Sequence, residues 1–198
     1  MFSLEGRVAL ITGANTGLGQ AIAIALASAG ADIACAGTSA PDETAEKVKA
    51  LGRRFIAIKA DISSLAPVQN LVDQTISELG ALDILVNNAG TIRRADAIDF
   101  TEADWDAVMD VNLKTAFFLC QAAGRHMIAK GQGKIINIAS MLSFQGGIRV
   151  PSYTASKSGV LGLTRLLANE WAGRSINVNA IAPGYMETDN TAQLREDR

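Results

Sequence analysis

The sequence is poor in the residues that build metal centres and disulfide frameworks. It has one histidine and two cysteines among 198 residues. Because His126 stands alone, a histidine-rich metal site is excluded, and we expect no bound metal. Cys35 and Cys120 lack CxxC spacing and fall within an expected strand and an expected helix, which is typical of small core residues in a reducing compartment. The expected location is therefore the cytoplasm.

Neither a strong charge imbalance nor a long apolar run is present. The net charge is −2, without the basic excess of a nucleic-acid-binding surface. The longest apolar runs have the length of a strand, well short of the ~20 residues that a membrane helix needs. The first residues, MFSLEGRVALITG, lack the basic and long apolar segments of a secretion signal. We therefore expect no nucleic-acid or membrane partner, and one domain over residues 1–198.

One segment combines a hydroxyl, a phenol and an ammonium group. Ser140 ends an apolar run, and Tyr153 and Lys157 follow it in the order YTASK. On a helix, the Tyr-x-x-x-Lys spacing places both side chains on one face, one turn apart. An ammonium close to a phenol favours the phenolate and lowers the phenol's pKa from about 10, so Tyr153 is a candidate acid–base group. The alternative is a half-buried aromatic ring beside a solvated lysine.

A glycine-rich turn near the N-terminus predicts a nucleotide site. The apolar run RVALIT is followed by GANTGLG and then by the alanine-rich stretch QAIAIALASAG, which gives the order strand, glycine turn, helix. Gly13, Gly17 and Gly19 would let the backbone approach a pyrophosphate, and the helix N-terminus offers free N–H groups. The spacing is GxxxGxG rather than GxGxxG. The alternative is a tight turn without a ligand.

Strand and helix patterns alternate along the whole chain. Strands are expected at 8–12, 33–36, 55–59, 84–86, 134–139 and 177–181. Helices are expected at 19–29, 42–51, 67–79, 102–130 (with a break) and 153–172. Short apolar strands suit a parallel sheet covered on both faces, so the sequence predicts a Rossmann-type, doubly wound α/β fold with its ligand crevice at the carboxyl ends of the strands.

These motifs together resemble a known family. TGANTGLG, the NNAG of residues 87–90, Asn112, Ser140, the Tyr153/Lys157 pair and the dipeptide Pro183-Gly184 occur in the order found in short-chain dehydrogenases/reductases. The resemblance covers essentially all of the chain. It implies an oxidoreductase that moves a hydride between a nicotinamide cofactor and a secondary alcohol or ketone.

The resemblance also implies roles for individual residues. Tyr153 would be the general acid–base, Lys157 would lower its pKa and hold the ribose of the nicotinamide half, and Ser140 would bind the reacting oxygen. Asn112 would kink a helix and hold a water of the proton relay, although an ordinary polar helix residue is the alternative. Asn87 is expected to be structural, joining adjacent strand ends.

The implied cofactor-binding residues follow the strand ends. Asp61 would face the adenine amino group, with an N-cap or turn residue as the equally weighted alternative. The full set is Gly13, Asn15, Thr16, Gly17, Leu18, Gly19, Asp61, Ile62, Asn88, Ala89, Gly90, Tyr153, Lys157, Pro183, Gly184 and Thr188.

The choice between NAD and NADP is a question of charge. NAD-preferring relatives carry an aspartate near position 37, where this chain has Gly37. The extra phosphate of NADP needs cations, yet no lysine or arginine lies between Arg7 and Lys47, and Asp42 and Glu43 lie just beyond the second strand. The sequence therefore predicts NAD, with NADP less favoured.

Arginines mark the expected substrate side. Arg93 and Arg94 follow NNAG, and Arg149 precedes Tyr153 by four residues. Arginine suits two-point binding of a carboxylate, so at least one of the three, together with Gln145, is a candidate substrate ligand. Solvated loop charges or subunit contacts are the alternative. NNAGTIRRADA and the segments around residues 138–159 and 176–191 resemble family members that oxidise deoxy-sugar acids in uronate and pectin breakdown.

The chain departs from the family in its last part. Family members continue beyond the PG motif through a helix and a final strand, so six of the usual seven strands are expected, without the C-terminal part. Full-length relatives assemble as tetramers, and a homo-oligomer is expected here. Two rival readings stay open: a reductase of another carbonyl substrate, such as a 3-oxoacyl thioester or a gluconate ketone, and a non-catalytic nucleotide-binding member of the fold.

Overall fold

Six parallel strands form one sheet in the order β3-β2-β1-β4-β5-β6. The computed structural model describes residues 3–186. The strands are β1 Val8–Thr12, β2 Asp32–Gly37, β3 Phe55–Lys59, β4 Ile84–Asn87, β5 Gly133–Ile138 and β6 Ile176–Ile181. Each strand begins and ends within one residue of its predicted bounds, because a short run of β-branched and apolar residues between helical patterns marks both ends of a strand.

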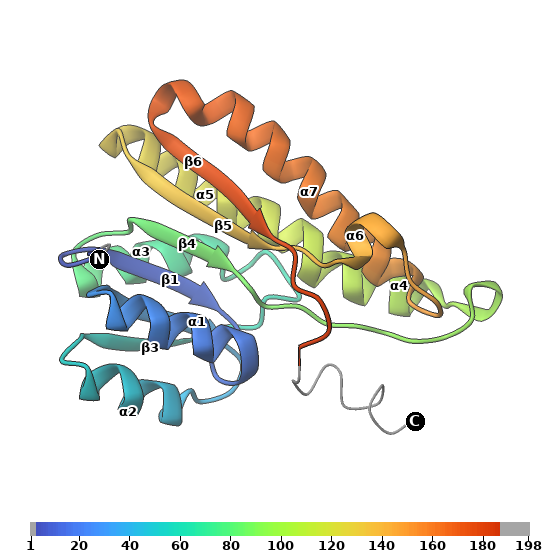
Figure 1. Ribbon diagram of the computed structural model, residues 1–198, viewed down its shortest axis with the longest axis horizontal. Coiled ribbons are helices and arrows are strands. Elements are labelled where there is room, and N and C mark those ends of the chain that lie inside the picture. The colour runs from blue at the N-terminus through green and yellow to red at the C-terminus, as the bar shows by residue number, and fades with distance from the viewer. Residues whose placement is uncertain (1–2, 187–198) are drawn as a thin grey trace.

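Helices cover the sheet on both faces (Figure 1). They are α1 Gly17–Ser28, α2 Asp42–Ala50, α3 Val68–Leu79, α4 Glu102–Met109, α5 Ala116–Lys130, α6 Leu142–Gln145 and α7 Pro151–Trp171. Short turns lie at Ala97–Asp99 (η1), Asp110–Thr115 (η2) and Ala172–Arg174 (η3). The predicted α/β fold is confirmed, with six strands among the described residues.

Two apolar clusters flank the sheet. On one face α1 and α2 pack against strand residues such as Ile11 and Ile33, and on the other α3, α5 and the end of α7 pack against residues such as Leu10 and Ile135. The chain reverses its winding between β1 and β4, which are neighbours in the sheet. In sheets of this kind, the loops at the carboxyl ends diverge at such a point and leave a crevice.

The predicted helix 102–130 is interrupted by a π-helical turn, η2, which separates α4 from α5. This is the expected break, and Asn112 lies inside it. The short helix α6 was not predicted, because four residues show no helical period. In the described part of the chain, no helix combines the length and apolarity needed to cross a membrane.

The amino edge of the sheet, where the strands begin, holds a buried carboxylate. Asp83, with 7% of its side chain exposed, pairs with Arg7 at 3.2 Å and Lys130 at 2.7 Å and accepts a hydrogen bond from the Val8 N–H at 3.0 Å. Burial raises the pKa of this carboxyl, but the hydrogen bonds and charge of its partners outweigh burial, and the pKa lies below its usual value. This cluster joins β1, β4 and α5 at the edge away from the crevice.

Candidate functional site

The glycine turn between β1 and α1 is held close to neighbouring backbone. The Gly13 N–H donates to the Ala36 carbonyl at 2.8 Å, and Gly13 and Gly17 have φ values of 66° and 55°. A Cβ at Gly19 would lie 2.2 Å from the Gly13 oxygen, so only glycine fits there without a shift. No side chain caps α1 at Thr16, and the first N–H groups of the helix therefore stay available to an anion.

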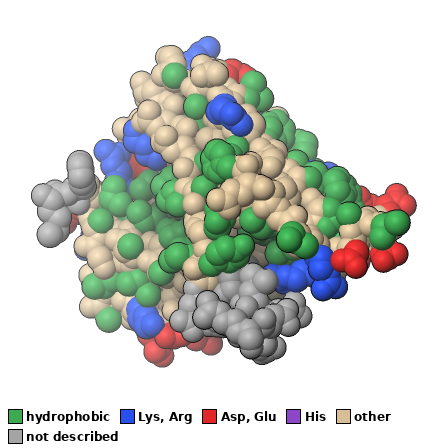
Figure 2. Space-filling view, turned by 45° about the vertical axis from the view of Figure 1, so that its right-hand side comes forward, with side chains coloured by type: hydrophobic (Ala, Val, Ile, Leu, Met, Phe, Trp, Pro, Cys, Tyr) green, Lys and Arg blue, Asp and Glu red, His purple; other side chains and the backbone are tan. Residues whose placement is uncertain are grey.

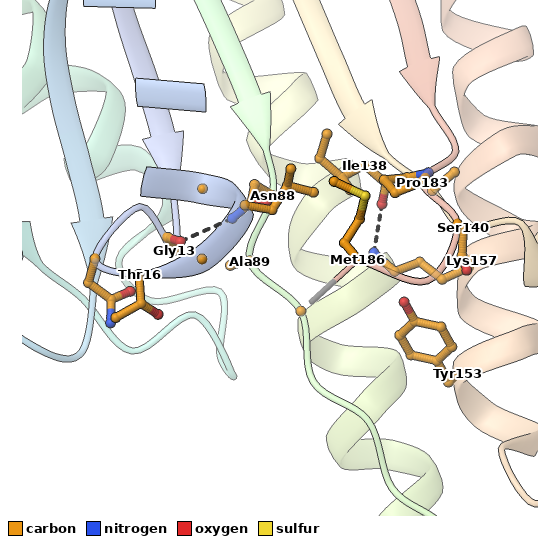
Figure 3. A pocket seen from close by; sticks show the side chains of 17 residues that line it. Gly13, Thr16, Asn88, Ala89, Ile138, Ser140, Tyr153, Lys157, Pro183 and Met186 are labelled. Atoms are coloured by element: carbon orange, nitrogen blue, oxygen red, sulfur yellow. Dashed lines mark hydrogen bonds between the residues drawn. The ribbon is translucent and has the colours of Figure 1, made fainter. Parts of the chain in front are cut away.

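The carboxyl end of β4 is tied to this turn. The Thr12 hydroxyl accepts hydrogen bonds from the N–H groups of Asn88 and Ala89 at 3.1 and 3.0 Å. The Asn88 side-chain amide donates to the carbonyls of Thr12 and Gly13, each at 3.0 Å, and Figure 3 shows the bond to Gly13. These bonds hold the NNAG segment against the glycine turn.

Asn87 has the structural position that the sequence predicts. Its amide donates to the Asn137 side-chain oxygen of the adjacent strand β5 at 2.9 Å. The prediction that it joins adjacent strand ends is therefore confirmed.

Ser140, Tyr153 and Lys157 lie together at the end of β5 and the start of α7 (Figure 3). The Lys157 ammonium donates to the Ile138 carbonyl at 2.6 Å and lies 5.7 Å from the centroid of the Tyr153 ring. The Ser140 hydroxyl accepts from the Leu142 N–H at 3.2 Å. The structure thus brings together the three side chains that the sequence singled out.

Burial dominates the acid–base properties of this group. It raises the pKa of Tyr153, while a hydrogen bond with Ser140 and the charge of Arg94 lower it to a smaller extent. Burial also lowers the pKa of Lys157 to about 8, because the ammonium has left water. The expected lowering of the phenol's pKa by Lys157 is not found; the lysine itself carries the larger shift.

Asn112 links three elements. Its side-chain oxygen accepts from the Thr91 N–H at 2.8 Å, and its amide donates to the Thr91 carbonyl at 2.9 Å and to the Ser156 hydroxyl at 3.2 Å. Ser156 in turn donates to the Tyr153 carbonyl at 2.9 Å. The π-helical turn aims Asn112 at the loop after β4 and at α7, so it is more than an ordinary polar helix residue.

A cavity of about 320 Å³ runs from the glycine turn to Tyr153 and Lys157. Its walls are formed by Gly13, Asn15, Thr16, Gly17, Leu18, Gly19, Asn88, Ala89, Gly90, Ile138, Ala139, Ser140, Tyr153, Lys157, Pro183, Gly184 and Met186. Most of the predicted cofactor residues lie in this wall.

Some predicted site residues lie elsewhere. Asp61 and Ile62 are not among the lining residues; the Asp61 carboxylate accepts from the Ser63 N–H at 2.9 Å, which is the turn role given as the alternative. Thr188 lies outside the described residues. Gln145 is exposed at the end of α6.

The three candidate arginines differ in their surroundings. Arg93 pairs with Asp104 at 3.5 Å, and Arg149 pairs with Asp96 at 3.1 Å. Arg94 is half-buried, and its charge acts on the Tyr153 phenol. Of the three, only Arg94 is placed electrostatically at the tyrosine.

The sequence analysis missed Ile138, Ala139 and Met186 as cavity residues. Ile138 and Ala139 directly precede Ser140 at the end of β5, and the rule that ligands lie beyond strand ends would have found them. Met186 has no such signal, because it follows the last strand in an irregular segment.

The chain belongs to the short chain dehydrogenase family, whose profile matches residues 7–198. It is therefore an oxidoreductase that uses a nicotinamide cofactor. The chain is 63% identical over 197 residues to the 2-dehydro-3-deoxy-D-gluconate 5-dehydrogenase of Escherichia coli, covering 99% of this chain and 78% of that protein.

Solved structures give the same family. A candidate 2-deoxy-D-gluconate 3-dehydrogenase from Agrobacterium tumefaciens with bound NADP is 61% identical, with a TM-score of 0.92 over 99% of this chain and 78% of that one. A candidate NAD(P)-dependent gluconate 5-dehydrogenase from Beutenbergia cavernae, with NADP at low occupancy, is 46% identical, with a TM-score of 0.93 over 99% and 79% of the two chains. Because both relatives hold NADP, the expectation that NADP is less favoured than NAD is wrong, and the comparisons do not decide between the two cofactors.

Proposed function

We propose that this protein catalyses reversible hydride transfer between a nicotinamide cofactor and a secondary alcohol or ketone of a deoxy-sugar acid. The observation that carries the proposal is the meeting of Ser140, Tyr153 and Lys157 at one end of a cavity whose other end is a glycine turn. The names of the relatives favour 2-dehydro-3-deoxy-D-gluconate or a similar acid of uronate and pectin breakdown as the substrate.

The residues present fit a dinucleotide. The pyrophosphate would lie against Gly13 and Gly19, which have no side chains, and at the start of α1, where no side chain caps the helix. Asn88 to Gly90 would lie along the adenosine half, and Pro183 and Gly184 would lie at the nicotinamide. When bound, the cofactor supplies the hydride acceptor or donor.

Tyr153 exchanges the proton of the substrate oxygen. Its phenol lies beside the Ser140 hydroxyl, which would donate to the reacting oxygen and stabilise the charge that develops there. Lys157 carries a proton that it releases easily, because its pKa is about 8. While it is protonated, its ammonium, 5.7 Å from the centroid of the Tyr153 ring, would favour the phenolate.

Asn112 fixes the geometry of this group. Its bonds to Thr91 and Ser156 hold the loop after β4 and the first turns of α7 in one register. We propose that it also supports the water through which protons leave the site, as the family resemblance implies.

Arg94 is the proposed ligand of the substrate carboxylate. Of the three arginines, Arg94 is the one whose charge acts on the Tyr153 phenol and lowers its pKa. A guanidinium at that position can bind a carboxylate by two bonds and orient the sugar acid towards the phenol.

We also propose a homo-oligomer in the cytoplasm. Several large apolar side chains are exposed, among them Ile98 at 93% and Trp105 at 39%, and Figure 2 shows hydrophobic side chains at the surface between polar ones. Both cysteines are buried and free, as is usual in a reducing compartment. Light scattering of the purified protein measures the assembly state.

The test is NADH and NADPH oxidation with 3-deoxy-D-glycero-2,5-hexodiulosonate. Turnover by Tyr153→Phe should be about three orders of magnitude lower than turnover by the wild type, since the variant lacks the acid–base hydroxyl. Tyr185→Phe is the matched control, because the only other tyrosine of the chain is 72% exposed. Equal activity of the two variants would contradict the role of Tyr153.

The same assay separates the rival readings. Turnover of a 3-oxoacyl thioester or of 5-keto-gluconate, without turnover of the diketo acid, would move the substrate to another carbonyl compound. Nucleotide binding without turnover of any of them would favour a non-catalytic member of the fold.

A further inference from the structure

Gly37 and Lys59 are partners at the carboxyl end of the β2–β3 pair. Each is the last residue of its strand, and the parallel register places them opposite each other. In the sheet order, β5 carries the reacting end of the cavity and β1 the glycine turn. The ends of β2 and β3 therefore lie where the adenosine half of a dinucleotide belongs.

The side chain of Lys59 lies on the same face as the open side of Gly37. Side chains alternate along β3, and Ile58 packs into the cluster beneath α3, whereas Phe55 packs into the cluster beneath α1 and α2. Lys59 shares the face of Phe55. Its partner Gly37 shares that face with Cys35, which lies in the cluster beneath α1 and α2. A Cβ at Gly37 would meet nothing within 4 Å, so room for a further group stands beside the lysine.

This place lies next to a residue of the cavity wall. Asn15, a lining residue, donates to the Ser39 hydroxyl at 2.8 Å, two residues beyond Gly37. This side-chain bond ties the glycine turn to the segment that follows Gly37.

The charged side chains around this space determine which ligand group can bind there. NADP differs from NAD by one phosphate dianion on the adenosine ribose, and such a group needs a cation. Asp42 and Glu43 stand in the first turn of α2, and Lys47 is occupied by Glu43 at 2.6 Å. Lys59 is exposed, and no carboxylate among residues 3–186 lies within ion-pair distance of it.

We propose that Lys59 is a specificity-determining residue that binds the 2′-phosphate of NADP from the neighbouring strand, in the space left open by Gly37. The proposal rests on the nucleotide binding assigned to this site above. It would give a chain without a lysine or arginine between Arg7 and Lys47 a cation for the extra phosphate of NADP.

The test measures cofactor binding without any substrate, by fluorescence titration of the purified protein with NADPH and with NADH. In Lys59→Ala, we expect the Kd for NADPH to rise about tenfold and the Kd for NADH to change less than about twofold, since only NADPH carries the phosphate. Lys59→Arg should retain most of the affinity for NADPH. Lys49→Ala is the matched control, because Lys49 is exposed in the last turn of α2.

Salt adds a second reading. Raising the ionic strength should weaken NADPH binding more in the wild type than in Lys59→Ala. An unchanged Kd for NADPH in Lys59→Ala, or an equal rise for both nucleotides, would overturn this proposal alone. Failure of the wild type to bind either nucleotide would overturn the proposed function and this proposal together.

Discussion

The strands begin at the amino edge of the sheet and end at its carboxyl edge, and a charged side chain is buried at each. The surroundings of these two side chains are opposite. At the amino edge, Asp83 is paired with two cations and a backbone N–H, which lowers its pKa. At the carboxyl edge, Lys157 has 4% of its surface exposed and donates to an uncharged carbonyl, and burial lowers its pKa to about 8. A neutralised charge stabilises the fold, whereas a charge kept ready to lose its proton serves chemistry.

The largest expected effect comes from removing the carboxyl-edge charge. Lys157→Met should lower kcat by about 10³-fold, because the phenolate loses its cationic neighbour. Its free energy of unfolding should stay within about 1 kcal/mol of wild type, since the lost hydrogen bond is offset by relief of a buried ammonium. Steady-state kinetics and urea unfolding measure the two quantities. A large loss of stability with little loss of kcat would reverse the comparison.

Next is the close approach at the glycine turn. Gly19→Ala should weaken NADH binding by at least about 100-fold, because the new Cβ would lie 2.2 Å from the Gly13 oxygen and 2.4 Å from the Asn88 amide. Isothermal titration with NADH gives the affinity.

The matched control for that variant is Gly162→Ala within α7. A Cβ there meets nothing within 4 Å, and the helix should gain about 0.5–1 kcal/mol. NADH binding by Gly19→Ala equal to that of Gly162→Ala would rule out the glycine turn as the pyrophosphate site.

Removing the amino-edge charge should affect only stability. Asp83→Asn should cost about 2–3 kcal/mol of unfolding free energy, because Arg7 and Lys130 lose a buried partner while staying partly exposed. Its kcat should match wild type. Glu43→Gln, which breaks an exposed pair with Lys47, is the control and should leave the unfolding free energy nearly unchanged, because solvent screens that pair. Equal losses of unfolding free energy in the two variants would show that the buried ion pairs of Asp83 stabilise the fold no more than an exposed pair does.

The smallest expected effects are differences in pH dependence. The pKa of Asp83 is lowered by folding, so its stabilisation is present above the unfolded value of about 3.9 and is lost as the pH falls below it. The stability difference between wild type and Asp83→Asn should therefore shrink below about pH 4.

Lys157 should act at the alkaline end. Its pKa falls from 10.5 to about 8 on folding, so the unfolded chain binds more protons between these values. Wild type should then gain stability relative to Lys157→Met as the pH rises through this range. Urea unfolding at several pH values checks both signs, and a loss of relative stability above pH 8 would contradict the lowered pKa.

Local patterns in the sequence predicted most of the fold. The six strands are short apolar runs between helical patterns, and a buried parallel strand leaves few other ways to satisfy such a run. The glycine turn and the Tyr153/Lys157 spacing were equally readable, because each depends on residues within one turn or one helix. The short helix α6 was not, since it depends on packing rather than on period, and the break at Asn112 was expected only from the family resemblance.

By itself, the sequence determined the order of the elements, the glycine turn and the side chains that can carry acid–base chemistry, because these follow from neighbours along the chain. The tertiary structure decided what depends on distant partners. It set the placement of Arg94 beside Tyr153 and the lowered pKa of Lys157. It also placed Lys59 opposite Gly37, because strand pairing joins residues that are 22 positions apart in the sequence (59 − 37) and the surrounding chain alone shows no cation there.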